Sequence, residues 1–412
     1  MNRQVFQILL FVCALSFSGS RGACPADSWA PIGPAGQAIR AIALSPHDLN
    51  LLIVGTNDGI YRRTSNDTLW RQVALPGQMV VALVADPFSP ARFYAGVIGG
   101  GIWLTNDNGD NWRQVLPDSL TIMTFSIPPD RPSEVYAGTT THGVMFSWNS
   151  GENWVFIGPQ NTSVQTIQIP AVAPDIVYIG TTIGLFKSQN RGNNWIPTGI
   201  EFGSRDIRTL AVDPHNNQLL YAGTKGSGIW ISHNGGIGWW PNNDGLTHIF
   251  IRAIAMDPNN NRKLYAGTHG NGIFTSDDGG GQWRLSGLDN QIVLTTQIHP
   301  LDNRRVYAGS GKAGVYQLVR ETVAPQSFRV LQNYPNPFRA ITTIQYDLPV
   351  DSDVTLEFYD VAGRKVDVMR QGRQLAGTWR ILWEPKGLSS GIYFVQVKTE
   401  QKAQVIKMAL IR

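Results

Sequence analysis

Cysteine is almost absent from this chain of 412 residues, which contains only two. Cys13 falls within the first apolar segment and Cys24 follows it, so removal of that segment would leave no intrachain disulfide. The seven histidines are scattered, and the chain has neither a His-Glu-x-x-His nor a Cys-x-x-Cys motif. We therefore predict no metal site and no cofactor.

Charged residues are also scarce, at 16% of the chain. Residues 23–326 hold 20 Lys and Arg against 22 Asp and Glu, whereas residues 327–412 hold 12 against 8. Most of the chain is thus nearly neutral and lacks the basic stripe that a phosphate backbone requires, so we expect no nucleic-acid partner. No segment after Phe17 reaches 18 uninterrupted apolar residues, and we expect no transmembrane helix.

The N-terminus has the pattern of a secretory signal peptide. Arg3 precedes an apolar run from Val5 to Phe17, and small residues follow it. This run is too short to remain as a membrane span, so we predict a signal peptide over residues 1–22. Arg21 stands three positions before Cys24, where a lipoprotein signal has an aliphatic residue, and lipidation is therefore not favoured.

Tryptophan is abundant and regularly spaced. Seven tryptophans recur 41 to 44 residues apart, and a glycine that ends a Tyr-Ala-Gly-type strand and a proline that closes an apolar run also recur seven times. The tryptophans are Trp29, Trp70, Trp112, Trp154, Trp195, Trp239 and Trp283. The glycines are Gly55, Gly96, Gly138, Gly180, Gly223, Gly267 and Gly309, and the prolines are Pro46, Pro87, Pro128, Pro170, Pro214, Pro258 and Pro300. A period of 40 to 50 residues is typical of the blades of a β-propeller.

The repeats also predict how the propeller closes. Residues 251–288 contain four short strands separated by tight turns, as expected of one blade. The last repeat has three strands only, at 292–298, 305–308 and 314–318. Trp29–Pro34 resembles Trp154–Pro159, which is a fourth strand, so we expect the N-terminal segment to complete the last blade and to cover its open edge.

The pattern changes after Leu318. We expect a propeller over residues 23–320, a linker over 321–330 that contains Pro325, and a second domain over 331–412. The second domain shows several alternating strands in about 80 residues, which favours a small Ig-like β-sandwich. The predicted fold is therefore all-β: a seven-bladed β-propeller followed by a small β-sandwich.

The tryptophan turns resemble the Asp-box (BNR repeat), Ser/Thr-x-Asp-x-Gly-x-x-Trp. Two turns match it fully and three have Asn in place of Asp. The residues concerned are Asp107, Gly109, Trp112, Asn149, Trp154, Asn190, Trp195, Asn234, Trp239, Asp278 and Trp283. The expected role is structural, because the side-chain oxygen can accept backbone N–H bonds across the turn. Asp-box propellers include sialidases, xyloglucanase-like hydrolases, sortilin-type receptors and photosystem II assembly factors, so the resemblance implies a fold and no single activity.

The C-terminal region resembles the sorting domain of type IX secretion substrates. Asn333–Phe338 opens the match, Tyr359–Val366 and Leu388–Phe394 follow in the family's order, and Lys407–Arg412 ends it. The resemblance implies a bacterium of the Bacteroidetes type, passage through the periplasm, and delivery to the cell surface or the medium. The type IX secretion machinery is then the expected partner of residues 331–412.

Three arginines stand at matching positions: Arg40, Arg208 and Arg252 each lie six residues before the proline of their repeat. An arginine cluster binds the substrate carboxylate in sialidases, and guanidinium groups suit that task. The Arg-Ile-Pro motif of sialidases is absent, however, and no Tyr–Glu nucleophile arrangement is visible. We favour the alternative that related repeats share an arginine whose stem covers apolar surface.

No catalytic residue can be named from the sequence, because nothing singles out the pair of carboxylates that a glycosidase needs. If the propeller binds a ligand, the connections from second to third strands and from fourth strands to the next first strands should form the binding face. The candidates are Arg40, Asp58, His142, Arg205, Arg208, Lys225, His248, Arg252, His269 and Lys312. The first hypothesis is a monomeric, exported binding module for a glycan or a protein, more in keeping with the sequence than an enzyme. The alternative is a secreted glycoside hydrolase or related polysaccharide-active enzyme.

Overall fold

The computed structural model describes residues 27–64, 67, 69–117, 119–199, 201, 203, 205–320, 325–333, 336–338 and 342–411. The signal peptide expected at residues 1–22, together with Cys24, lies outside these residues. Strands dominate the described part of the chain, and no helix in it is both long and apolar enough to cross a membrane.

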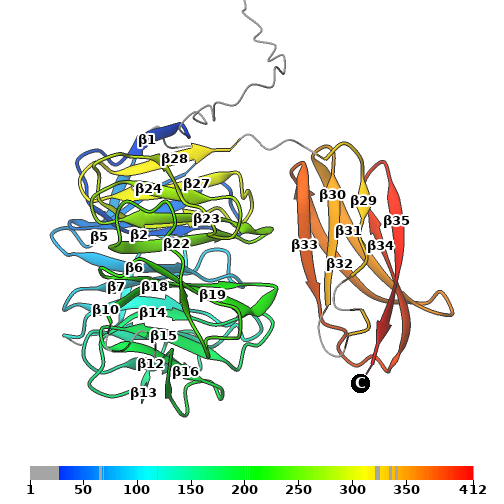
Figure 1. Ribbon diagram of the computed structural model, residues 1–412, viewed down its shortest axis with the longest axis horizontal. Helices are drawn as coiled ribbons and strands as arrows, with labels where there is room; N and C mark the ends of the chain where they lie inside the picture. Colours follow the sequence, from blue (N-terminus) through cyan, green and yellow to red (C-terminus); the bar gives the residue numbers. More distant parts are fainter. Residues whose placement is uncertain are drawn as a thin grey trace, which may run out of the picture.

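Residues 29–319 form seven four-stranded antiparallel sheets, the blades of a propeller (Figure 1). Blade 1 comprises β2 (Ile39–Leu44), β3 (Leu52–Thr56), β4 (Gly59–Arg63) and β5 (Arg71–Ala74). Blade 2 comprises β6 (Val80–Ala85), β7 (Phe93–Val97), β8 (Gly101–Thr105) and β9 (Arg113–Leu116). Blade 3 comprises β10 (Ile122–Ser126), β11 (Val135–Thr139), β12 (Val144–Ser147) and β13 (Val155–Gly158). Blade 4 comprises β14 (Val164–Gln168), β15 (Val177–Thr181), β16 (Gly184–Ser188) and β17 (Ile196–Thr198).

The remaining blades continue the same order around the ring. Blade 5 comprises β18 (Ile207–Asp213), β19 (Asn216–Thr224), β20 (Ile229–Ser232) and β21 (Trp240–Pro241). Blade 6 comprises β22 (Ile251–Asp257), β23 (Asn260–Thr268), β24 (Ile273–Ser276) and β25 (Arg284–Gly287). Blade 7 comprises β26 (Val293–Ile298), β27 (Arg305–Ser310), β28 (Val315–Val319) and, from the other end of the chain, β1 (Trp29–Gly33). The all-β, seven-bladed fold predicted from the sequence is confirmed.

Blade 7 closes as the sequence predicted. β1 pairs antiparallel with β28, with Trp29 opposite Leu318 and Ala30 opposite Gln317. Figure 1 shows β1, in blue, beside the yellow β28. β1 therefore covers the edge of β28. Strands from the beginning and the end of the propeller sequence are joined in one blade.

The recurring glycines allow neighbouring blades to approach closely. Each lies near the end of the second strand of its blade, against the first strand of the next. A Cβ atom at Gly55 would lie 2.6 Å from the carbonyl oxygen of Val80, and one at Gly180 would lie 2.6 Å from Cγ2 of Ile207. Side chains at these positions would force the blades apart, which explains why the glycine repeats with the blade.

The turns that resemble the Asp-box are held by their own side chains. The Asp107 carboxylate accepts a bond of 2.9 Å from the backbone N–H of Asn111, and this bond is the first cause that lowers the pKa of Asp107 to about 2. Asn149, Asn190, Asn234 and Asp278 accept the corresponding backbone N–H with their side-chain oxygens. These turns join third to fourth strands, so they lie at the opposite end of each blade from the turns that join second to third strands.

Buried tyrosines link four of these five turns to the preceding blade. The hydroxyl groups of Tyr94, Tyr136, Tyr178 and Tyr221 each donate to a backbone carbonyl in the corresponding turn of the next blade. The turn therefore contributes to packing between blades as well as to its own blade, and its geometry should affect the stability of the propeller.

We predict that Asp278→Ala lowers the free energy of unfolding by about 1 kcal/mol, because the backbone N–H of Gln282 and the hydroxyl of Ser276 lose their acceptor. Asp278→Asn is the matched control, because three other turns already carry Asn there, and it should stay close to the unaltered protein. Denaturant unfolding of both variants measures the difference. Equal losses in the two variants would show that the charge, and not the acceptor oxygen, stabilises the turn.

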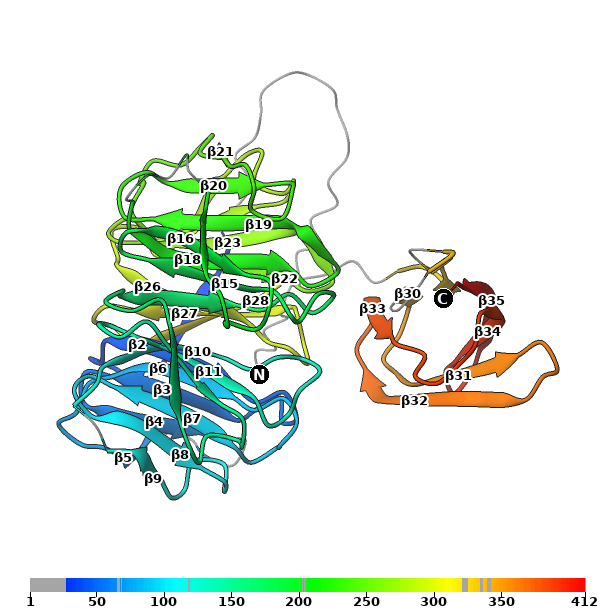
Figure 2. The same cartoon turned by 90° about the horizontal axis from the view of Figure 1, so that it is seen from below.

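The second domain is a β-sandwich with its own core (Figure 2). One sheet has the order β29-β30-β33 and the other the order β32-β31-β34-β35. The strands are β29 (Arg329–Val330), β30 (Thr342–Leu348), β31 (Ser352–Asp360), β32 (Lys365–Gln374), β33 (Gly377–Trp383), β34 (Gly391–Lys398) and β35 (Ala403–Leu410). Trp383 is buried at the centre and stacks on Phe358 with ring centroids 4.1 Å apart. Phe328 and β29 belong to this domain, so it includes the last residues of the segment expected to be a linker.

Candidate functional site

The first strand of every blade faces the central channel, and one end of that channel is a cavity of about 310 Å³. Each first strand carries a β-bulge near its start, where one residue has no partner on the second strand. A bulge re-aims a side chain, and all seven bulge residues line this cavity. In blade order they are Arg40, Val81, Met123, Gln165, Arg208, Arg252 and Leu294, and we call them the bulge ring.

The three arginines identified in the sequence are therefore equivalent positions of one ring. Arg208 donates to the side-chain oxygen of Gln165 at 3.0 Å and forms an ion pair with Asp206. Arg40 donates to the side-chain oxygen of Asn57 at 2.7 Å. The guanidinium carbon of Arg252 lies 5.5 Å from the centre of the Phe250 ring.

Among the described residues no carboxylate forms a salt bridge with Arg252 or with Arg40. Asp206, whose charge acts on Arg252, is paired with Arg208. Burial is the main cause that lowers the pKa of Arg252, and the nearby positive charges of Arg208 and Arg40 lower it further. The free energy of this arrangement would fall if an anion lay among the three guanidinium groups.

Further basic and aromatic groups extend the site outward between blades 5 and 6. Lys225 forms a β-bridge with Phe250, and the Phe250 ring stacks on His269 with centroids 4.6 Å apart. Burial, followed by the charges of Arg252, His248, Arg208 and Lys225, lowers the pKa of His269, so its imidazole is neutral at neutral pH. Arg205 lies over the ring of Trp230 and donates to the Ser227 hydroxyl.

Several polar atoms at this junction have no hydrogen-bond partner among the described residues. They are Oδ1 of Asp206, Nε of Arg208, Nε2 of His248 and Nδ1 of His269, all buried. Buried polar atoms are nearly always satisfied, by the protein, by water or by a ligand. The free guanidinium donor of Arg208 and the excess of positive charge indicate a place for a polar, anionic group, whereas the free oxygen of Asp206 requires a hydrogen-bond donor.

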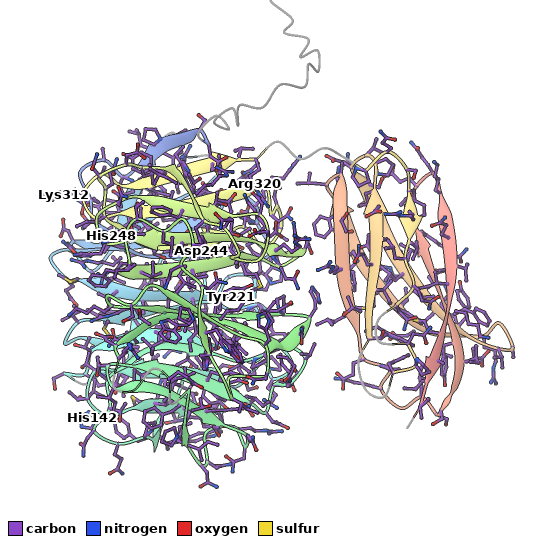
Figure 3. All side chains as sticks on the ribbon, in the orientation of Figure 1. His142, Tyr221, Asp244, His248, Lys312 and Arg320 are labelled. Carbon is purple, nitrogen blue, oxygen red and sulfur yellow. The ribbon has the colours of Figure 1, made fainter. Side chains whose placement is uncertain are left out.

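The structure does not bring all ten sequence candidates together. Arg205, Arg208, Lys225, His248, Arg252 and His269 gather at blades 5 and 6, and Arg40 reaches the same channel mouth from blade 1. Asp58 accepts the backbone N–H of Gly77 within blade 1, and His142 contacts Thr141 and Phe156 in blade 3. Lys312 is exposed on the turn between β27 and β28 of blade 7. Figure 3 shows His142, His248 and Lys312 on the side of the propeller away from the β-sandwich.

Sequence reasoning missed four members of the bulge ring: Val81, Met123, Gln165 and Leu294. A signal was available, because the ring residue lies six positions before the repeated proline in five blades and five positions before it for Met123 and Gln165. The described residues that line the cavity include no Asp and no Glu.

The strands define a seven-bladed β-propeller followed by a β-sandwich. Residues 332–412 match the family described as a secretion system C-terminal sorting domain, so this sandwich is a sorting domain. Its presence indicates export by the type IX secretion system to the cell surface or the extracellular space. A search of curated proteins finds no match to the sequence.

Solved structures with the same architecture support the fold. YCF48 bound to a D1 peptide aligns with a TM-score of 0.56 and 14% identity, over 71% of this chain and 97% of that one. YCF48 from Cyanidioschyzon merolae gives 0.56 and 15%, over 70% and 98%. The GH74 enzyme of Niastella koreensis gives 0.57 and 13%, over 93% and 74%. At such low identity these similarities establish the fold and leave the activity open.

Proposed function

We propose that this protein is an exported binding module that takes an anionic group of a glycan or a protein at the bulge ring. The observation that carries the proposal is the concentration of Arg208, Arg252 and Arg40 at one channel mouth, where the nearest carboxylate, Asp206, is paired with Arg208 and no described carboxylate forms a salt bridge with Arg252. A carboxylate there would accept charge-assisted hydrogen bonds from the guanidinium groups and relieve their mutual repulsion.

The alternative is a polysaccharide hydrolase, and the site supports it less well. Retaining and inverting glycosidases generally need two carboxyl groups about 5 to 10 Å apart around the bond that is cleaved. The described residues lining the channel mouth include no acid, and Asp206 at its margin is engaged with Arg208. The similar structures do not decide between the two hypotheses, since one is described with a bound peptide and another as an enzyme.

The test is a binding screen with the matched variants Arg252→Gln and Arg113→Gln. Acidic glycans and peptides are offered on arrays, and affinities are then measured by calorimetry. Arg252→Gln should weaken binding about 10- to 100-fold, which is the loss of affinity expected when one charge-assisted hydrogen bond is removed. Arg113 lies on an outer strand, where it pairs with Glu152, and its variant should bind normally.

A glycosidase panel run on the same preparation separates the hypotheses. Unchanged affinity in Arg252→Gln would show that the ring is not part of the binding site. Turnover of a polysaccharide that persists after purification to homogeneity would favour the enzyme.

A further inference from the structure

The bulge ring has two chemically different sides. Gln165, Arg208 and Arg252 occupy successive blades 4, 5 and 6, whereas Val81 and Met123 occupy blades 2 and 3. In a closed ring of seven blades, blades 2 and 3 lie across the channel from blades 5 and 6. The polar arc and the apolar pair therefore face each other over the channel mouth, and Leu294 lies between Arg252 and Arg40.

This asymmetry comes from side-chain type alone. The same bulge recurs in every blade, so the backbone offers seven equivalent positions. Val81, Met123 and Leu294 are each partly exposed inside the mouth. Apolar side chains facing a water-filled channel gain free energy if a ligand removes them from water.

The layer beneath the ring leaves room for such a ligand. The next residue along each first strand is Ala or Thr, and larger residues such as Ile42, Leu83 and Phe125 follow it in the lining; the small residues are Ala41, Ala82, Thr124, Thr166, Thr209, Ala253 and Thr295. Together with the ring, these residues line the cavity of about 310 Å³. This volume suits a small group or the end of a larger molecule, and not a folded partner.

We infer that the group bound at the ring is an amphiphilic carboxylate, with its anionic end on Arg208 and Arg252 and an adjoining apolar arm against Val81 and Met123. The inference rests on the proposed function and narrows it. A purely polar acid such as a sugar acid would leave the apolar pair in water, and a neutral apolar ligand would leave Arg252 without a salt bridge.

The experiment is a titration of the unaltered protein, residues 23–412, with acetate, butyrate and hexanoate. Binding is monitored by NMR at constant ionic strength. The dissociation constant should fall about threefold for each added methylene, because each buries apolar surface. Hexyltrimethylammonium should bind poorly, since its charge is repelled. Met123→Gln and Val81→Thr should flatten the dependence of the dissociation constant on chain length. Val155→Thr, on the exposed outer strand β13, is the matched control and should keep the full dependence.

The outcomes separate the two proposals. Acetate binding that Arg252→Gln weakens, with no gain from longer chains, would overturn the amphiphile and leave the anion site intact. No binding of any carboxylate would overturn both. N-acetyl-leucine and N-acetylglycine form a second arm, in which the leucine derivative should bind more tightly. Preference for N-acetyl-leucine over hexanoate assigns the carboxylate to a peptide-like chain end, and the reverse assigns it to a free fatty acid; either order supports the inference.

Discussion

Deleting residues 27–33 should destroy the closed propeller. The deletion removes β1, so β28 becomes an unpaired edge strand and blade 7 keeps three strands. It also removes Trp29, which meets the Tyr265 ring edge-on at 6.3 Å and donates from Nε1 to the Ser286 hydroxyl at 3.1 Å. These contacts join blade 7 to blade 6, so their loss weakens the boundary between the two blades as well as the blade itself.

The point variant Trp29→Ala separates packing from strand pairing. It should lower the free energy of unfolding by about 3 kcal/mol. This is the lower end of the range for loss of a packed aromatic side chain, and it applies because Trp29 is only partly buried. Trp240→Ala is the matched control on the outer strand of blade 5, where Trp240 is 51% exposed, and it should cost much less.

Calorimetry and light scattering measure both effects. The deletion variant should melt well below the unaltered protein and self-associate through the free edge of β28. A deletion variant that stays monomeric with an unchanged melting temperature would mean that the seventh blade is stable with three strands.

The sequence predicted the parts of the fold that depend on local and repeated chemistry. The glycine of each second strand is visible in the sequence because a Cβ atom would collide with the next blade, as at Gly55 and Val80. The closing strand could be predicted because Trp29–Pro34 resembles Trp154–Pro159. The latter segment is the outer strand of blade 3, which already has four strands.

The site was harder to predict, for two physical reasons. Strand side chains alternate with a period of two, and a bulge shifts that alternation by one residue, so the channel-facing side chain cannot be read from alternation alone. For this reason alternation does not identify Val81 and Met123 as positions equivalent to Arg208. The net charge of the repeat region is also close to zero, which hides a local excess of positive charge at blades 5 and 6.

The second large effect concerns export. Removing residues 332–412 should keep the protein inside a host that has type IX secretion, because the family matched by these residues is a sorting domain. The propeller itself should remain folded. The buried core of the sandwich draws only on residues 328–410, and the propeller clusters draw on none of them, within the part of the chain that the structure describes. Where the two domains approach, Pro214 and Pro258 of the propeller and Trp379 of the sandwich border a cavity of about 530 Å³.

Fractionation of the host and calorimetry of the purified propeller test these two expectations separately. The truncated protein should be found in the periplasm and not in the medium or on the surface, and its melting temperature should lie within about 2 °C of the propeller transition of the full chain, since few packed contacts are lost. A full-length Trp379→Ala variant is the control for the domain boundary: it alters the side of the sandwich nearest the propeller and should be exported normally. Normal export of the truncated protein would place the export signal elsewhere in the chain. A propeller that melts much earlier without the sandwich would show that the two domains stabilise each other across the turns at Pro214 and Pro258.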